Sequence, residues 1–159
     1  MSKPGRRRRR SSCSRTPRSG SPVPLAIDDR PPVTVTRALC RVEDLRDGHS
    51  RGFDPLGEGR DTMFIVRQGD RLVAWRNNCP HYDNARMAWK KDEFLNADRD
   101  RIVCGAHGAL FEIDSGLCVQ GPCLGDRLIP VALDIRDGEV FLAAPYKHGM
   151  RPRPGRPHN

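Results

Sequence analysis

Short runs in which hydrophobic and polar residues alternate occupy the central part of the chain, a pattern typical of half-buried β-strands. Two such runs, Thr62–Arg67 and Arg71–Arg76, are rich in β-branched and aromatic residues. They are separated only by Gln68-Gly69-Asp70, so the pattern predicts a hairpin.

A second hairpin is predicted near the end of the hydrophobic part of the chain. Apolar residues alternate along Ile129–Ile135, and Glu139–Ala143 returns after Asp137-Gly138. An Asp-Gly pair between alternating segments is the strongest short-range signal of a hairpin.

Four further short strands and very little helix complete the predicted elements. The best helical period covers one or two turns near Ala85–Lys90. Many short strands with Gly and Pro between them indicate an all-β sandwich or barrel. The four further strands are Val33–Leu39, Ile102–Val103, Ala109–Ile113 and Leu117–Val119.

Charge is distributed unevenly along the 159 residues. The formal net charge is +8, yet residues 1–24 hold eight basic and no acidic residues, and residues 147–159 hold four basic and no acidic residues. Residues 25–146 are therefore net −4, which suits docking onto basic protein surfaces rather than onto nucleic acid. Both tails are poor in apolar side chains, so we expect them to be disordered on either side of one folded domain.

Neither membrane insertion nor export is expected from the sequence. No apolar run approaches the ~20 residues of a membrane span. The run Arg6–Arg10 is followed by Ser, Pro, Arg and Gly where an export signal needs an apolar segment. We therefore expect a cytoplasmic protein, in which the Arg-rich tail is the one segment that suits nucleic acid.

Cysteine and histidine residues form the most informative pattern. Six cysteines in a chain without an export signal are more often metal ligands or free thiols than disulfides. Cys79-Pro80-His81 is followed, after 22 intervening residues, by Cys104-Gly105-Ala106-His107. Such a set of two Cys and two His fits tetrahedral zinc, or a two-iron cluster with thiolates on one iron and imidazoles on the other.

These motifs resemble the signature of Rieske 2Fe-2S domains, which is Cys-x-His, then Cys-x-x-His-Gly, a strand and a Gly-Pro segment. Here the signature reads Cys79-Pro80-His81, Cys104–Phe111 and Gly121-Pro122. The resemblance extends from about Val33 to Ala144. The segment Leu39–Leu45 with the following Gly48 looks like the family's opening strand and turn, and the final Asp-Gly hairpin looks like its last two strands.

The resemblance implies a Rieske-like antiparallel sandwich of short sheets in 25–146, with a cluster-binding subdomain at about 77–125. It implies one 2Fe-2S cluster per chain, with two thiolates on one iron and two imidazoles on the other. A Gly-Pro loop would cover the cluster from a third side. The four implied ligands are Cys79, His81, Cys104 and His107.

Several positions depart from the respiratory members of the family. The two cysteines that form a disulfide there correspond to Asn84 and Ala106, so that bridge cannot form. The hydroxyl and tyrosine that donate hydrogen bonds to sulfur there correspond to Ala109 and Phe111. Without those donors the resemblance implies a low-potential cluster, toward about −150 mV.

Other notable residues leave alternatives open. The gap between the two motifs is long, and its excess, Met87–Asp100, either recognises a partner or covers one face of the subdomain. Cys118 and Cys123 can form a disulfide, sense redox state or pack as buried thiols.

The remaining cysteines, histidines and one tryptophan have plainer interpretations. We expect Cys40 and Trp75 in the core and Cys13 in the first tail. The three histidines outside the motifs are expected to face solvent: His49, His148 and His158.

The resemblance implies a one-electron carrier rather than an enzyme. It would pass electrons from a ferredoxin reductase to an oxygenase or a similar acceptor. No segment after Ala144 would build the mononuclear iron domain of an oxygenase. Two other functions stay open on the residues alone: a redox sensor based on the cluster or on thiols, and a structural zinc-binding interaction module.

Overall fold

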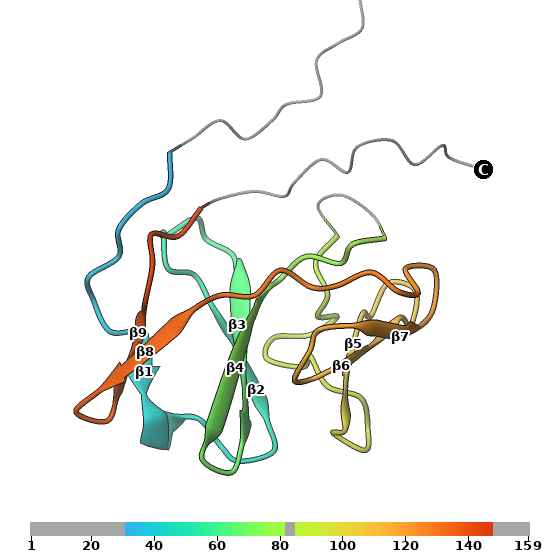
Figure 1. The fold of residues 1–159 in the computed structure, drawn as a ribbon, viewed down its shortest axis with the longest axis horizontal. Coiled ribbons are helices and arrows are strands. Elements are labelled where there is room, and N and C mark those ends of the chain that lie inside the picture. The colour runs from blue at the N-terminus through green and yellow to red at the C-terminus, as the bar shows by residue number, and fades with distance from the viewer. Residues whose placement is uncertain (1–30, 82–84, 148–159) are drawn as a thin grey trace, which may run out of the picture.

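Three small antiparallel sheets make up the part of the chain that the computed structural model describes, residues 31–81 and 85–147 (Figure 1). A single turn of 3-10 helix, η1 (Val42–Asp44), is the one helical element in these ranges. The all-β fold predicted from the sequence is therefore confirmed. The sheets have the orders β1-β9-β8 (Cys40–Arg41, Glu139–Leu142, Leu133–Arg136), β2-β3-β4 (Ser50–Phe53, Met63–Gln68, Arg71–Arg76) and β5-β6-β7 (Arg101–Val103, Leu110–Glu112, Cys118–Gln120).

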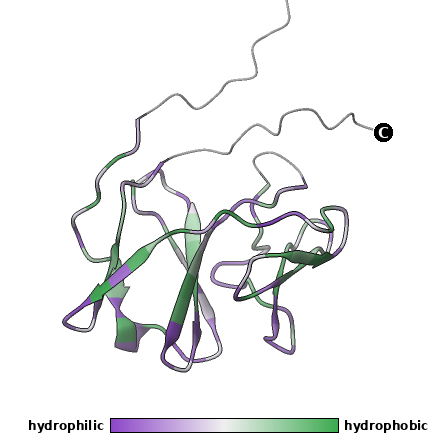
Figure 2. Ribbon diagram, viewed as in Figure 1, coloured by the Kyte–Doolittle hydropathy of each residue, from purple (hydrophilic) through white to green (hydrophobic). Residues whose placement is uncertain are grey.

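The sheet β2-β3-β4 lies between the other two (Figure 1). Hydrophobic residues follow β3 and much of β4, whereas β2 and the turns are more polar (Figure 2). Strand β3 is fully buried from Met63 to Val66. Phe64 and Val66 belong to one hydrophobic core, whereas Met63 and Ile65 belong to the other. A strand with both faces buried needs a continuous apolar run, which is what Met63-Phe64-Ile65-Val66 provides.

The sheet β5-β6-β7 is built from a segment inserted between β4 and β8. The chain leaves after β4 and returns beside it, where the Arg76 amide donates to the Ile129 carbonyl at 2.9 Å and the Val131 amide donates to the Ala74 carbonyl at 2.9 Å. The indole of Trp75 also donates to the carbonyl of Ile113 at 3.1 Å. These bonds fix the inserted unit against the middle sheet, and Trp75 is core as expected.

Both predicted hairpins are confirmed. In the first, Gln68 pairs with Arg71 across Gly69-Asp70. In the second, the central residues Asp137 and Gly138 have φ of 53° and 76°, the left-handed pair that a tight two-residue hairpin requires. Only Leu133–Arg136 of the first arm is a strand, because the preceding residues pair with β4 instead.

Two predicted elements are wrong and one strand was missed. Val33–Leu39 makes isolated contacts in place of a strand, since Val33 pairs with Tyr146 while Leu39 bonds the carbonyl of Val140. Ala85–Lys90 forms no helix, because its backbone groups bond the ligand loops described below. The missed strand is β2, whose Ser50 and Arg51 lack an apolar pattern.

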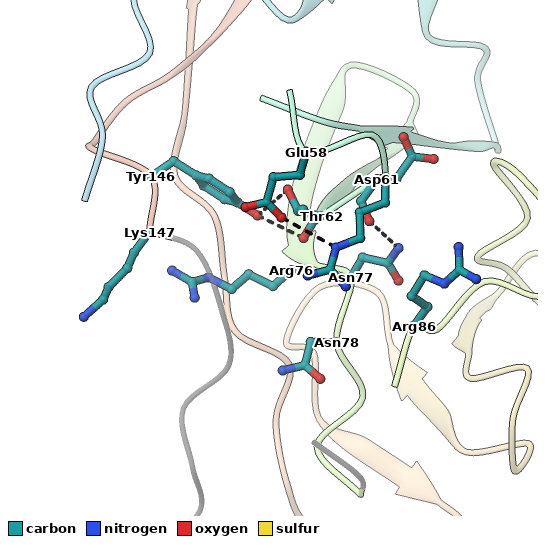
Figure 3. Close-up of a pocket in the computed structure, with 10 residues that line it drawn as sticks. Glu58, Asp61, Thr62, Arg76, Asn77, Asn78, Arg86, Tyr146 and Lys147 are labelled. Carbon is teal, nitrogen blue, oxygen red and sulfur yellow. Dashed lines mark hydrogen bonds and ion pairs between the residues drawn. The ribbon is translucent and has the colours of Figure 1, made fainter. Parts of the chain in front are cut away.

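Tyr146 ties the end of the fold to its middle sheet. Its backbone pairs with Val33, and its hydroxyl donates to the Thr62 carbonyl at 2.9 Å (Figure 3). The expected disordered tails, 1–24 and 147–159, lie outside the described residues apart from Lys147. No helix in the described ranges has the length and apolarity that a membrane span requires.

Candidate metal centre

The first predicted ligand loop follows β4 and is held by Asn77. The side-chain amide of Asn77 donates to the carbonyl of Asp61 at 2.8 Å, and its side-chain oxygen accepts from the amide of Met87 at 2.8 Å. The Cys79 amide bonds the Ala85 carbonyl at 3.1 Å. Asn77 therefore clamps the entrance of the Cys79-Pro80-His81 loop to the segment that follows it.

The second predicted ligand loop turns from β5 into β6. The Cys104 amide donates to the Ala109 carbonyl at 2.8 Å, and the Gly108 amide donates to the Cys104 carbonyl at 2.8 Å. Gly108 has a φ of +66°, a conformation that glycine adopts at no steric cost. A Cβ there would meet no atom within 4 Å, so the backbone conformation rather than crowding explains the glycine.

Donor atoms from the two loops converge on one place. The ligand atoms of Cys79, His81 and Cys104 all lie within 4.8 Å of one another. Nδ1 of His81 is 2.5 Å from Sγ of Cys79 and 4.0 Å from Sγ of Cys104. His107 joins this group, because its Nδ1 contacts Nε2 of His81 and the two rings lie edge to face at 4.4 Å.

Burial separates the two kinds of donor. The thiols of Cys79 and Cys104 are fully buried, whereas His81 is half-buried and His107 is exposed. This donor set fits a cluster with thiolates on an inner iron and imidazoles on an outer one.

The two buried thiols have pKa values shifted in opposite directions. A hydrogen bond to the Cys104 sulfur raises the pKa of Cys79, and burial raises it further. The same hydrogen bond lowers the pKa of Cys104 to about 6. A lowered thiol pKa favours the thiolate, which is the form of cysteine that binds a metal.

The Gly121-Pro122 segment packs against the second ligand loop. A Cβ on Gly121 would lie 2.8 Å from the Cα of Ala109, and its φ is +106°. Glycine is therefore required at this position on two counts. Next to it, the Sγ atoms of Cys118 and Cys123 are 3.1 Å apart.

The other cysteines and histidines lie away from the donor group or outside the described residues. Cys40 is half-buried against the core of the β1-β9-β8 sheet, as expected. His49 is half-buried rather than exposed, because its ring bonds the carbonyl of Asp47 at 2.7 Å. The predictions for Cys13, His148 and His158 lie outside the described residues, as does that for Asn84.

A small polar pocket lies behind the first ligand loop (Figure 3). Its volume is about 40 Å³, room for little more than a water molecule. Arg76, Asn77, Asn78 and Tyr146 are among its lining residues.

The sequence interpretation missed the structural role of Asn77. Two consecutive asparagines at the end of a strand, directly before a ligand motif, were the available signal, because buried amides pin loops by bonding backbone groups. It also left open the role of Met87–Asp100. Met87 and Phe94 of that segment are buried in the core, which agrees with the expectation that it covers part of the subdomain, whereas Trp89 is 80% exposed.

Comparison with known families decides what this donor group belongs to. The family model described as Rieske [2Fe-2S] domain matches residues 36–135. The chain belongs to the Rieske [2Fe-2S] domain family. Its cofactor is therefore a 2Fe-2S cluster rather than zinc, and its function is to carry electrons.

Relatives of this Rieske chain include small carriers and part of a much longer protein. It is 26% identical over 112 residues to the ferredoxin CarAc of Metapseudomonas resinovorans, covering 69% of this chain and 94% of that protein. It is 30% identical over 110 residues to human apoptosis-inducing factor 3, covering 69% of this chain and 16% of that protein.

Solved structures share the Rieske fold. A chain of the complex of reduced oxygenase and oxidised ferredoxin in carbazole 1,9a-dioxygenase matches with a TM-score of 0.54 and 24% identity, over 70% of this chain and 95% of that one. The Sphingomonas yanoikuyae B1 ferredoxin matches with a TM-score of 0.52 and 23% identity, over 69% of this chain and 98% of that one.

Proposed function

We propose that this chain is a Rieske-type ferredoxin in which Cys79 and Cys104 hold one iron and His81 and His107 hold the other. The observation that carries the proposal is the convergence of two thiols and two imidazoles from separate loops. When bound, the cluster supplies reversible one-electron chemistry.

The proposed ligands differ in their exposure to solvent, and this difference indicates the side on which electrons enter and leave. Cys79 and Cys104 lie in the core, where the surrounding apolar residues exclude water from the sulfur atoms. His107 is exposed and His81 is partly so, which brings their ring edges within reach of a docked protein. We place the route of electron entry and exit at these two imidazoles.

The proposed domain extends over 25–146, with the cluster-binding subdomain at about 77–125. Two observations support these limits. Val33 and Tyr146 pair near the ends of the domain, and the inserted unit leaves and rejoins the middle sheet at Arg76 and Ile129.

The proposed partners are a ferredoxin reductase as donor and an oxygenase as acceptor. The support comes from relatives: one is named a ferredoxin, and one solved match is a chain of an oxygenase–ferredoxin complex in carbazole 1,9a-dioxygenase. An electron carrier of this type needs one surface that serves both partners in turn.

Trp89 and its neighbours form the proposed docking face. Trp89 lies against the second ligand loop, because a Cβ on Gly105 would be 3.2 Å from the backbone nitrogen of Trp89 and 3.0 Å from its Cβ. Beside it is an open depression of about 460 Å³. Four cationic and two acidic residues line the depression: Arg60, Arg86, Lys90 and Lys91 with Asp54 and Asp61.

This local charge points to an acidic partner surface, the opposite of what the domain's net charge of −4 indicates. Charges near the contact steer association more than distant ones, because salt screens fields over about 8 Å. The docking face therefore fits an oxygenase surface that presents carboxylates around an apolar contact for the indole.

Metal analysis and spectroscopy test the proposed centre. Protein purified without oxygen should contain iron and acid-labile sulfide in equal amounts, near two of each per chain. Voltammetry should show a reversible one-electron wave, and the reduced protein should give the electron paramagnetic resonance signal of a cluster with mixed sulfur and nitrogen ligands. A colourless protein that contains zinc would contradict the proposal.

Stopped-flow mixing tests the docking face. The reduced protein is mixed with the oxidised oxygenase component of carbazole 1,9a-dioxygenase, used as a probe acceptor. Trp89→Ala should slow reduction of the oxygenase several-fold and leave the cluster spectrum unchanged. Ile135→Ala is the control, because Ile135 is half exposed but lies in β8, away from the ligand loops. Equal rates for both variants would place the contact elsewhere.

A further inference from the structure

Two cysteines outside the proposed ligand set lie in contact beside the centre. The Sγ atoms of Cys118 and Cys123 are 3.1 Å apart, and both side chains are buried. No bond joins them, since both are free thiols. The proposed electron-carrier function uses neither of them.

The backbone holds the two thiols in this position from both ends of a tight turn. The Gly125 amide donates to the Cys118 carbonyl at 2.9 Å, and the Cys118 amide donates to the Asp126 carbonyl at 2.7 Å. The Asp126 amide in turn donates to the Cys123 carbonyl at 2.9 Å. A disulfide needs a sulfur separation of about 2 Å, so closure requires the sulfurs to approach by only about 1 Å.

The turn that covers these thiols is thin and exposed. Gln120, Gly121 and Pro122 between them face solvent, and the side chain of Leu124 is 65% exposed. Exposed turns with few buried contacts open locally at low free-energy cost. A small reagent can therefore reach the sulfurs without unfolding of the domain.

We propose that Cys118 and Cys123 form a redox-active dithiol, a second redox centre that reacts with low-molecular-weight disulfides. One cysteine attacks the reagent as its thiolate, forming a mixed disulfide and releasing one thiol. The other cysteine then attacks the mixed disulfide and releases the second thiol. The pair loses two electrons and two protons, and the reagent disulfide gains both as two thiols.

In the same proposal the dithiol is coupled to the ligand set through Cys79. Cys123 and Cys79 are buried in the same hydrophobic core. With Cys79 bound to iron as thiolate, the Cys123 thiol would be the donor of a hydrogen bond to its sulfur, and such a bond raises the potential of a cluster. Bridging to Cys118 removes that donor, so oxidation of the dithiol lowers the midpoint potential. This coupling rests on the proposed function, whereas the thiol chemistry does not.

Thiol labelling of the whole protein tests the dithiol. The protein is equilibrated with mixtures of glutathione and glutathione disulfide, quenched with acid, labelled with a maleimide and cleaved with trypsin. Residues 102–127 contain no Lys or Arg before Arg127, so one peptide carries Cys104, Cys118 and Cys123. We expect this peptide to take three labels in glutathione and one label in glutathione disulfide, reversibly.

Matched variants locate the bridge. Cys118→Ser and Cys123→Ser should each form no intramolecular bridge; the remaining cysteine can go no further than a mixed disulfide, which mass spectrometry detects as an added glutathione. Cys40→Ser should behave as wild type. Three labels at every glutathione ratio would overturn the proposal, as would a bridge that persists in Cys118→Ser.

Voltammetry then tests the coupling. The midpoint potential should fall on oxidation of the wild-type dithiol and stay constant in Cys118→Ser. A bridge that forms without a change of potential would overturn the coupling to Cys79. A protein without iron would refute the proposed function alone, because the labelling result stays readable.

Discussion

Ala109 and Phe111 are two buried residues next to the proposed centre whose side chains donate no hydrogen bonds. Both are fully buried; Ala109 directly precedes β6, and Phe111 lies within it. Because donors to sulfur stabilise the more negative reduced state, we expect their absence to keep the midpoint potential low. A hydroxyl group added at either position is therefore expected to change the midpoint potential.

The double variant Ala109→Ser, Phe111→Tyr should raise the midpoint potential. A hydrogen bond that favours the reduced state by about 1 kcal/mol shifts a one-electron potential by about 40 mV. Voltammetry measures the shift, and Ala88→Ser, a hydroxyl added on the neighbouring segment, is the control. A potential that falls or stays constant would show that these positions do not face the sulfur atoms.

His107→Cys should retain a cluster but at a more negative potential. A thiolate adds a charge that a neutral imidazole does not, so it disfavours the reduced state. The visible spectrum should also shift toward that of a cluster with four thiolates. A spectrum identical to wild type would mean that His107 is not a ligand.

At the scale of elements, the sequence predicts what local patterning determines. The two hairpins follow from alternation and from glycine at left-handed positions such as Gly69 and Gly138. The four donors follow from a motif that is contiguous in each half. The β2 strand and the absence of a helix at Ala85–Lys90 follow instead from pairing with distant residues, which propensity does not encode.

The contact between Cys118 and Cys123 is another feature that the local sequence pattern does not determine. Their spacing permits a bridge, a sensor or simple packing, and only the folded turn brings the sulfurs to 3.1 Å. In contrast, Gly121 was predicted as part of a covering loop, and its close approach to Ala109 agrees with that interpretation.

The segment Met87–Asp100 is expected to combine stability and recognition in separate residues. The ring of Phe94 stacks on that of Phe64 at 4.1 Å and is buried. Phe94→Ala should therefore lower the free energy of unfolding in urea by about 3–5 kcal/mol. Trp89→Ala, an exposed aromatic of the same segment, should cost no more than about 0.5 kcal/mol. A similar loss for both would mean that Trp89 is structural.

At the scale of the whole molecule, Tyr146 makes the free energy of unfolding depend on pH in the alkaline range. Burial raises the pKa of Tyr146 above its ordinary value near 10. As the pH rises, the phenol therefore ionises in the unfolded chain before it does so in the folded protein. The contribution of the neutral Tyr146 side chain to the free energy of unfolding is complete below about pH 10 and is lost as the pH rises further.

Tyr146→Phe tests this dependence and the two hydrogen bonds to Thr62. We expect the free energy of unfolding to fall by about 1 kcal/mol at pH 8. The difference from wild type should shrink between pH 10 and pH 11.5, measured by urea unfolding. A constant difference would show that the phenol does not titrate differently in the two states.

The inserted unit begins and ends at neighbouring backbone positions, because Arg76 and Ile129 are joined by a hydrogen bond. Because the ends lie this close, a change of length within the segment need not displace the six strands outside it. Exchange of residues 77–128 as a whole, with its core contacts such as Phe94 on Phe64 retained, is therefore expected to change the potential and the docking face while the six strands stay in place.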